Sequence, residues 1–283
     1  MTIAADIKLR DESFAFNDSR RLPRIALTTS IAYAKGARHT LDVCRPKSAT
    51  AAPVIVFFYG GGWRSGSKRT YRYVAKALAR RGYVAVLPDY RIYPQARYPD
   101  FLDDGALAVR WVKDNAQRFG GDPQKIFLMG HSAGAHIAAM LAIDATWLQK
   151  VALAPGRDIA GLIGISGPYD FLPLKDGIFK IIFGGDRPET QPISHVTPGA
   201  PPVLLLTGGK DNVVGAGNST RLAERLRAAG NEATAVIYPR TGHFIIVAAI
   251  APIIRSLVPI LRDTDAFIAK VLKSRVQAGE AAP

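Results

Sequence analysis

The residues best suited to chemistry lie in the pentapeptide 130–134, which reads Gly-His-Ser-Ala-Gly. An apolar run, Ile126–Met129, leads directly into it, and the small-residue run Ala133–Ile143 follows. A G-x-S-x-G sequence between a strand and a helix forms a sharp turn, because the glycines remove side chains that would clash. The turn raises the serine hydroxyl to a helix N-terminus, where backbone N–H groups favour developing negative charge. The pattern predicts that Ser132 is a nucleophile.

A serine hydroxyl is a weak nucleophile and needs a base. His243 follows the last strand-like run, Ala233–Tyr238, and a loop beyond that strand can bring it above Ser132. The other histidines fit less well. His39 lies in an N-terminal strand candidate, His131 in the serine turn and His136 in the helix after it. His195 lies in an insertion, where it could at most contact substrate. We therefore expect His243 to be the base.

The base in turn needs a carboxylate that orients it and stabilises the imidazolium. Asp211 follows the strand-like run Val203–Thr207 directly, which gives the chain order Ser132, Asp211, His243. Asp170, after the run Ile159–Ser166, is the rival acid, and we expect it to stabilise its own loop instead.

Donors for an oxyanion are expected in the segment Tyr59–Trp63, which contains three consecutive glycines after the strand-like run Val54–Phe58. Glycines let the backbone approach a substrate and aim N–H groups at it. The N–H of Ala133, next to the nucleophile, would be another donor. The alternatives are a phosphate loop or a simple turn, but no Walker lysine–serine pair follows, and Trp63 is bulky where a phosphate would lie. Trp63 is instead assigned to substrate binding.

Elements that would position these residues alternate along the chain. The strand-like runs are near-continuous in apolar residues, as in a parallel sheet buried on both faces: Val54–Tyr59, Tyr83–Pro88, Lys125–Gly130, Ile159–Ser166, Val203–Thr207 and Ala233–Tyr238. Helical patterns cover Thr70–Arg81, Phe101–Gln117, Ala133–Ile143 and Asn218–Ala229. The alternation predicts an α/β fold, and Arg24–Tyr33 with Ala37–Arg45 predicts an antiparallel hairpin at one edge.

The length of 283 residues suits one α/β domain over 1–283. The segment 171–197, rich in Pro, Gly and Lys, predicts a small cap insertion with a short helix near Ile178–Phe183. A last helix is expected over Asp263–Ser274 and a disordered tail over Gln277–Pro283. The apolar fraction of 48% and the charged fraction of 21% exclude disorder of the whole chain.

Composition limits which partners, disulfides and metals we expect for this chain. The net charge of +14 is scattered, and no nucleic-acid motif accompanies it, so we expect a solvated basic surface rather than a nucleic-acid partner; attraction to another anionic partner is the alternative. The single cysteine, Cys44, excludes an internal disulfide and is expected to be buried in a strand. The histidines show no metal-ligand spacing, so no metal or cofactor is expected.

Two segments bear on location. The N-terminus, Met1–Asp18, lacks the basic start and apolar run of a signal peptide, which favours the cytoplasm. Phe244–Leu261 approaches the length of a membrane span, but Pro252, Pro259 and the central Arg255 argue against a spanning helix. We expect buried helices or a homodimer surface there, with a peripheral membrane contact as the alternative.

These motifs together resemble the α/β-hydrolase carboxylesterases related to the hormone-sensitive-lipase type, and most closely the bacterial feruloyl/acetyl-xylan esterase-like enzymes and kynurenine formamidase. Two further segments share the resemblance, namely 89–94 (Asp-Tyr-Arg-Ile-Tyr-Pro) and 120–123 (Gly-Gly-Asp-Pro). The resemblance implies Gly61, Gly62 and Ala133 as oxyanion donors beside the three residues above. Where that group has His-Gly-Gly-Gly, this chain has Tyr59, whose hydroxyl has a different reach.

The function implied by the resemblance is hydrolysis of carboxylic esters through an acyl-enzyme on Ser132. A short cap predicts an open cleft that suits short acyl groups or bulky, even polymeric, esters. Arylformamide cleavage, a non-catalytic binding protein and a prolyl-oligopeptidase-type peptidase are the alternatives, and the last lacks room for its large N-terminal domain.

Overall fold

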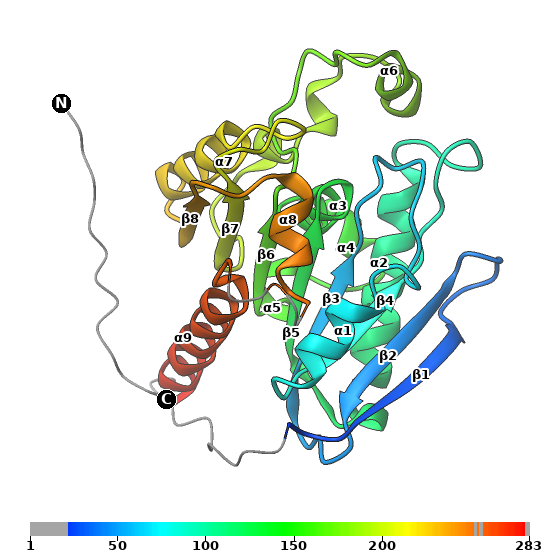
Figure 1. Ribbon diagram of the computed structural model, residues 1–283, viewed down its shortest axis with the longest axis vertical. Coiled ribbons are helices and arrows are strands. Elements are labelled where there is room, and N and C mark those ends of the chain that lie inside the picture. The colour runs from blue at the N-terminus through cyan, green and yellow to red at the C-terminus, as the bar shows by residue number, and fades with distance from the viewer. Residues whose placement is uncertain (1–21, 252–253, 255–256, 281–283) are drawn as a thin grey trace.

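An eight-stranded sheet runs through the part of the chain that the computed structural model describes, residues 22–251, 254 and 257–280 (Figure 1). Its spatial order is β1-β2-β4-β3-β5-β6-β7-β8. The strands are β1 (Ile25–Ala32), β2 (Thr40–Pro46), β3 (Ala52–Phe58), β4 (Val84–Pro88), β5 (Gly121–His131), β6 (Gly161–Ile165), β7 (Val203–Gly208) and β8 (Ala233–Tyr238). Strands β3 to β8 pair in parallel, while β1 and β2 form an antiparallel hairpin whose second strand pairs antiparallel with β4.

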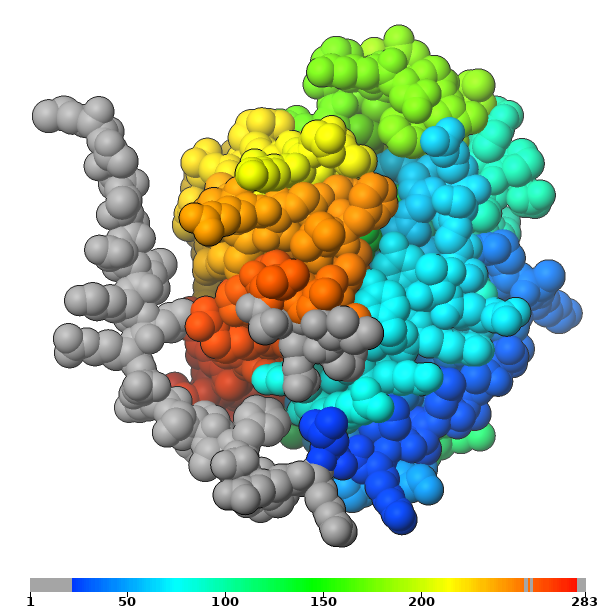
Figure 2. All heavy atoms as spheres, in the orientation of Figure 1, coloured from blue at the N-terminus to red at the C-terminus, as the bar shows by residue number. Residues whose placement is uncertain are grey.

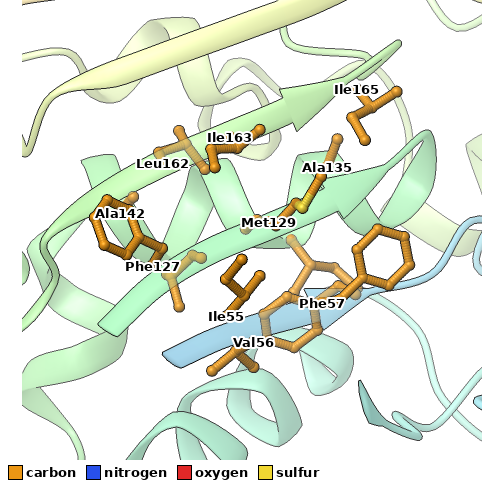
Figure 3. Close-up of a cluster of buried hydrophobic side chains, with 14 of the residues drawn as sticks. Ile55, Val56, Phe57, Phe127, Met129, Ala135, Ala142, Leu162, Ile163 and Ile165 are labelled. Atoms are coloured by element: carbon orange, nitrogen blue, oxygen red, sulfur yellow. The ribbon is translucent and has the colours of Figure 1, made fainter. Parts of the chain in front are cut away.

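The parallel strands consist of consecutive apolar residues because helices cover both faces of the sheet. Every residue of β4, β6 and β7 is buried. Figure 3 shows the result on β3, β5 and β6, where Ile55, Phe127 and Leu162 belong to one cluster of buried side chains. Burying each such side chain contributes about 1.5–3 kcal/mol. The six strand predictions and the edge hairpin are confirmed.

The helices within the described residues are α1 (Arg72–Ala79), α2 (Asp100–Asn115), α3 (Ala133–Ile143), α4 (Ala145–Gln149), α5 (Pro155–Asp158), α6 (Gly177–Phe183), α7 (Gly217–Ala228), α8 (His243–Ala248) and α9 (Ile260–Glu280). Short 3₁₀ turns cover Ala116–Phe119, Pro188–Thr190 and Pro192–His195. Helix α3 is buried along its whole length, because it packs on β5 and β6 and against α2. Helices α1 and α9 lie on the opposite face (Figure 1), where the Tyr83 hydroxyl donates to Asp265 at 2.8 Å.

The segment 171–197 lies beyond the carboxyl end of β6 and carries α6, as expected from its sequence. Asp176 caps this helix by accepting a hydrogen bond from the Ile178 N–H at 3.0 Å. In the space-filling view the segment projects at the top of the molecule (Figure 2). It therefore stands over the sheet edge at which catalytic loops of parallel sheets gather.

The prediction for the C-terminal end was wrong in part. Helix α9 does not stop at Ser274 but continues to Glu280, so residues 277–280 are helical rather than a disordered tail. The extension is anchored by Arg275, whose guanidinium donates to the carbonyls of Gln124 in β5 (2.9 Å) and of Ile159 just after α5 (3.4 Å). Residues 281–283 and the N-terminal segment Met1–Asp18 lie outside the described residues.

The apolar stretch 244–261 does not form a single helix. Helix α8 occupies its start, with Ile246 and Val247 buried and Phe244 69% exposed. Among the described residues, no helix is both long and apolar enough to cross a membrane.

Cys44 is fully buried in β2, as its sequence position predicted, and burial raises the pKa of its thiol.

Candidate active site

Ser132 occupies a strained turn between β5 and α3. Its backbone has φ 54° and ψ −124°, a conformation that L-residues rarely adopt. The flanking glycines make the turn sterically allowed: a Cβ on Gly134 would lie 2.1 Å from the carbonyl oxygen of Phe58. The Ser132 N–H donates to the carbonyl of Ile165 at 2.9 Å, which ties the turn to the next strand. The side chain is thereby presented at the carboxyl edge of the sheet.

The structure brings the three predicted residues together in one hydrogen-bonded chain. His243 Nε2 lies 2.9 Å from Ser132 Oγ, and His243 Nδ1 lies 2.8 Å from Asp211 Oδ2. Asp211 follows β7, and His243 follows β8 at the first turn of α8, so three different strand ends supply the chain. Because the ionised carboxylate only accepts, it fixes the proton on Nδ1 and leaves Nε2 free to accept the serine proton.

Asp211 is held in its ionised form. Burial opposes the charge, but hydrogen bonds from the His243 ring and the Val214 N–H, together with a charge on His243, outweigh it and keep the pKa of the Asp211 carboxyl below its usual value. Its Oδ1 accepts the N–H groups of Val213 (3.0 Å) and Val214 (2.8 Å), which fixes the carboxylate plane. The ionised Asp211 carboxylate can therefore accept a hydrogen bond from the His243 imidazolium and stabilise its charge.

The rival residues are engaged elsewhere. Asp170 pairs with Arg221 of α7, which also donates to the Asp170 carbonyl, so this carboxylate stabilises its own loop as expected. His195 in the insertion pairs with Asp144 and is absent from the lining of the pocket described below. His39 contacts Asp104 at 2.9 Å.

Three backbone N–H groups, two in the glycine segment and one next to Ser132, are candidate donors to an oxyanion. Within the described chain, the N–H groups of Gly61, Gly62 and Ala133 make no hydrogen bond to another protein group. Gly61 has φ +142°, and a Cβ there would lie 2.2 Å from the Ser65 carbonyl oxygen, so only glycine fits this loop. Both Gly61 and Gly62 line the same pocket as Ser132.

Tyr59 does not take part in this pocket but supports the loop from behind. Its ring is fully buried and stacks on Tyr90 with ring centroids 4.6 Å apart. The Tyr59 hydroxyl accepts a hydrogen bond from Arg38 Nη2 at 2.6 Å, and Tyr90 donates to the Tyr59 carbonyl at 2.7 Å. The sequence reasoning missed Arg38 and Tyr90, although Tyr90 lies in the segment 89–94 that it had singled out.

The pocket above Ser132 has a volume of about 760 Å³. Its wall is mainly apolar. The insertion and the segment before it contribute Pro168, Phe171, Leu172, Pro173, Leu174 and Phe179, and the segments next to Asp211 and His243 contribute Val213, Val214 and Phe244. Sequence reasoning did not identify these wall residues. A pocket of this kind favours an apolar group on either side of a reacting carbonyl.

Trp63 lines this pocket but is only 3% exposed, because its indole packs among the aromatic side chains of the insertion. It stacks on Phe171 at 6.0 Å and meets Phe179 and Phe183 edge to face at 5.7 and 4.8 Å. Its role in substrate binding stays a prediction. The contacts show that Trp63 also joins the loop of Gly61 and Gly62 to the insertion.

We expect Trp63→Ala to lower the free energy of unfolding by about 3–5 kcal/mol, because a large aromatic side chain leaves a cavity in a packed cluster. Urea denaturation measures the change. Trp63→Phe keeps part of the cluster and is the matched control, with a smaller loss. Equal stability of Trp63→Ala and the wild type would contradict the anchoring role.

Two buried histidines beside Ser132 titrate far from their usual range. Burial, aided by a charge on His243, lowers the pKa of His131 to about 3. Burial likewise lowers the pKa of His136 to about 4, although its Nε2 bonds the Thr190 carbonyl at 2.8 Å. Both rings are therefore neutral in the folded protein at any pH near neutrality.

These shifts predict loss of stability in mild acid. Below about pH 6.5 the unfolded chain takes up a proton on each of these two residues while the folded chain does not, so the free energy of unfolding falls with pH. Two protons correspond to a limiting slope of about 2.7 kcal/mol per pH unit. Urea titrations between about pH 6 and 4.5, above the range in which most carboxyls titrate, should show it. His136→Gln should halve the slope, and an unchanged slope would argue against the burial of a neutral ring.

The sheet order, the strained serine turn and the chain of Ser132, His243 and Asp211 define an α/β-hydrolase fold. A family model described as BD-FAE matches residues 41–226. The chain belongs to this family, which confirms the class that the motifs resembled.

Known relatives agree with this assignment. The esterase LipC of Mycobacterium tuberculosis is 33% identical over 235 residues, covering 75% of this chain and 58% of the relative. The isoprenylcysteine alpha-carbonyl methylesterase ICME of Arabidopsis thaliana is 31% identical, with 76% and 56% covered. The chain thus spans little more than half the length of these curated relatives.

Solved structures give the same fold over most of the chain. A butyrate-bound esterase from Thermogutta terrifontis superposes with a TM-score of 0.70 at 25% identity, covering 89% of this chain and 95% of the other. A carbohydrate esterase from gut microbiota superposes with a TM-score of 0.75 at 21% identity, covering 87% and 96%, which shows the fold alone.

Proposed function

We propose that this protein is a serine carboxylesterase that cleaves carboxylic esters through an acyl-enzyme on Ser132. The observation that carries the proposal is the complete hydrogen-bonded chain Ser132–His243–Asp211 under an apolar pocket with free N–H groups. The names of the relatives, esterases and methylesterases, support the same reaction. A non-catalytic binding protein would have no need of this chain.

The first step is attack on the ester. Ser132 Oγ bonds to the carbonyl carbon while His243 Nε2 takes the hydroxyl proton, and the Asp211 carboxylate stabilises the resulting imidazolium. The carbonyl oxygen becomes an oxyanion, for which the N–H groups of Gly61, Gly62 and Ala133 are the candidate donors. The tetrahedral intermediate then collapses, the C–O bond to the alcohol breaks, and His243 returns its proton to the leaving alkoxide.

The second step regenerates the enzyme. A water molecule takes the place of the alcohol and gives a proton to His243 Nε2 as its oxygen attacks the acyl carbon. The second tetrahedral intermediate collapses, the Ser132 Oγ–acyl bond breaks, and the proton passes from His243 to Ser132 Oγ. The products are one carboxylic acid and one alcohol, and no cofactor is consumed.

The substrate class follows from the pocket. A volume of about 760 Å³ with aromatic and aliphatic walls accommodates a bulky apolar acyl or alcohol group. The lining also carries polar side chains, among them Arg64, Lys175 and Asn218, so a substrate with a polar substituent can be accommodated as well. We also expect short acyl esters to be substrates.

A substrate panel tests the proposal. 4-Nitrophenyl acetate, butyrate and palmitate, a methyl ester of an aromatic acid, and N-formylkynurenine are compared by kcat/KM. We expect the short and aromatic esters to be turned over and a fluorophosphonate to label Ser132 in the intact protein. The formamide arm separates the arylformamidase alternative, since the same triad serves both reactions. Turnover of N-formylkynurenine alone, or no labelling of Ser132, would contradict the ester proposal.

A further inference from the structure

His131, the residue before the nucleophile, lies where three segments of the candidate site meet. Its ring is 1% exposed. Nε2 lies 3.1 Å from the carbonyl oxygen of His243, and Nδ1 lies 3.3 Å from the hydroxyl of Tyr71. On the third side the ring abuts the glycine loop, since a Cβ on Gly60 would lie 2.9 Å from His131 Nδ1.

The partners fix the tautomer of this ring. A backbone carbonyl can only accept, so Nε2 carries the proton and donates it to the His243 oxygen. Nδ1 is then bare and accepts the Tyr71 O–H. The His131 ring thereby bonds the serine turn to the backbone of His243, the base.

From this geometry we propose that His131 is a positioning residue that sets the distance between the Ser132 hydroxyl and the His243 imidazole. The inference rests on the proposed function of Ser132 and His243 but concerns a residue that neither step of the reaction uses. His131 is adjacent to Ser132 in the chain, so a bond from its ring to the His243 backbone couples the nucleophile to the base directly. Two other bonds of the base loop, from the Lys210 N–H to the Thr241 carbonyl and between the Asp211 and His243 side chains, tie it to the segment after β7, while its side-chain bond to the serine turn is that of His243 with Ser132 itself.

Charge is consistent with this role. The His131 and His243 rings have centroids 4.9 Å apart, so a proton on His131 would oppose the imidazolium that forms on His243. The groups facing His131 are His243, Asp211 and Tyr71. Burial keeps His131 neutral near neutral pH, since it lowers the pKa of His131 to about 3.

The test compares four variants with the wild type. His131→Leu removes the donor, and His131→Gln retains an N–H that reaches the same carbonyl. Tyr71→Phe removes only the hydroxyl behind the ring. His136→Leu is the matched control, because it replaces a second buried histidine, in α3 just after the serine turn, that bonds Thr190 instead of His243.

For His131→Leu we expect kcat to fall about 10- to 100-fold with KM nearly constant, the cost of a misplaced base. The acid limb of the pH profile of kcat/KM should move to lower pH, because a looser loop weakens the pairing of the His243 imidazolium with Asp211. His131→Gln should recover most of kcat, Tyr71→Phe should lose only a few-fold, and His136→Leu should leave the acid limb in place.

A second readout does not need turnover. The proton that bridges His243 Nδ1 and Asp211 is observed by low-field proton NMR, and its signal should broaden or vanish in His131→Leu and persist in His131→Gln and His136→Leu. If the wild type cleaves no ester but this pattern holds, the proposed function fails and the positioning role stands. If the wild type is active and His131→Leu keeps the same kcat, acid limb and NMR signal, the positioning role is overturned.

Discussion

Ser132→Ala should reduce kcat on every ester that the protein cleaves by about 10⁴- to 10⁶-fold. The substitution removes the atom that forms the acyl-enzyme, while the pocket and the free N–H groups remain. KM should change little, because the walls that bind the substrate are untouched. Residual hydrolysis above the uncatalysed rate is expected from the donors and from binding alone.

The control for this variant is another serine with a positive φ. Ser30 in β1 has φ 57°, close to the 54° of Ser132, and β1 is an edge strand, four strands away from β5. Ser30→Ala tests the cost of alanine at such a φ, and its kcat should match the wild type. Retention of more than about one hundredth of kcat in Ser132→Ala would exclude Ser132 as the nucleophile, given the usual size of this loss.

The fold and the chain of Ser132, Asp211 and His243 were predictable because their signals are local. A continuous apolar run predicts a parallel strand buried on both faces, even when the strands that pair with it are not known. The glycines around Ser132 report a turn that only small residues allow, and the other two residues follow directly after recognisable strands. Parallel strands place their carboxyl ends at one edge, so chain order alone brings these side chains together.

The walls of the pocket and the supports of the site were not predictable, because they depend on contacts between distant segments. The sequence predicted an insertion for Phe171 and a short helix within it for Phe179, but only tertiary packing places both rings against Trp63. The bond from His131 to the His243 carbonyl spans 112 positions and leaves no pattern in the sequence. Helix α9 was predicted too short for the same reason, since Arg275 bonds the carbonyl of Gln124 in β5, 151 positions away.

Asp211→Asn should lower kcat by about 10⁴-fold without disturbing the fold. The amide can donate to His243 Nδ1, which then carries no proton, so the proton moves to Nε2 and the ring no longer accepts from Ser132. The imidazolium also loses its counter-charge. The backbone contacts of Val213 and Val214 with Oδ1 can be kept by the amide oxygen, so the loop should remain in place.

Asp170→Asn is the matched control for this prediction, because Asp170 also follows a strand end and also lines the pocket. Its carboxylate pairs with Arg221, which is half exposed, so the loss of the charge costs little and kcat should stay within about 10-fold of the wild type. Measuring kcat across pH 6 to 9 for both variants separates the two carboxylates. Equal losses of kcat in both variants would contradict a special role for Asp211. A larger loss of kcat in Asp170→Asn would assign the role of orienting acid to Asp170 instead of Asp211.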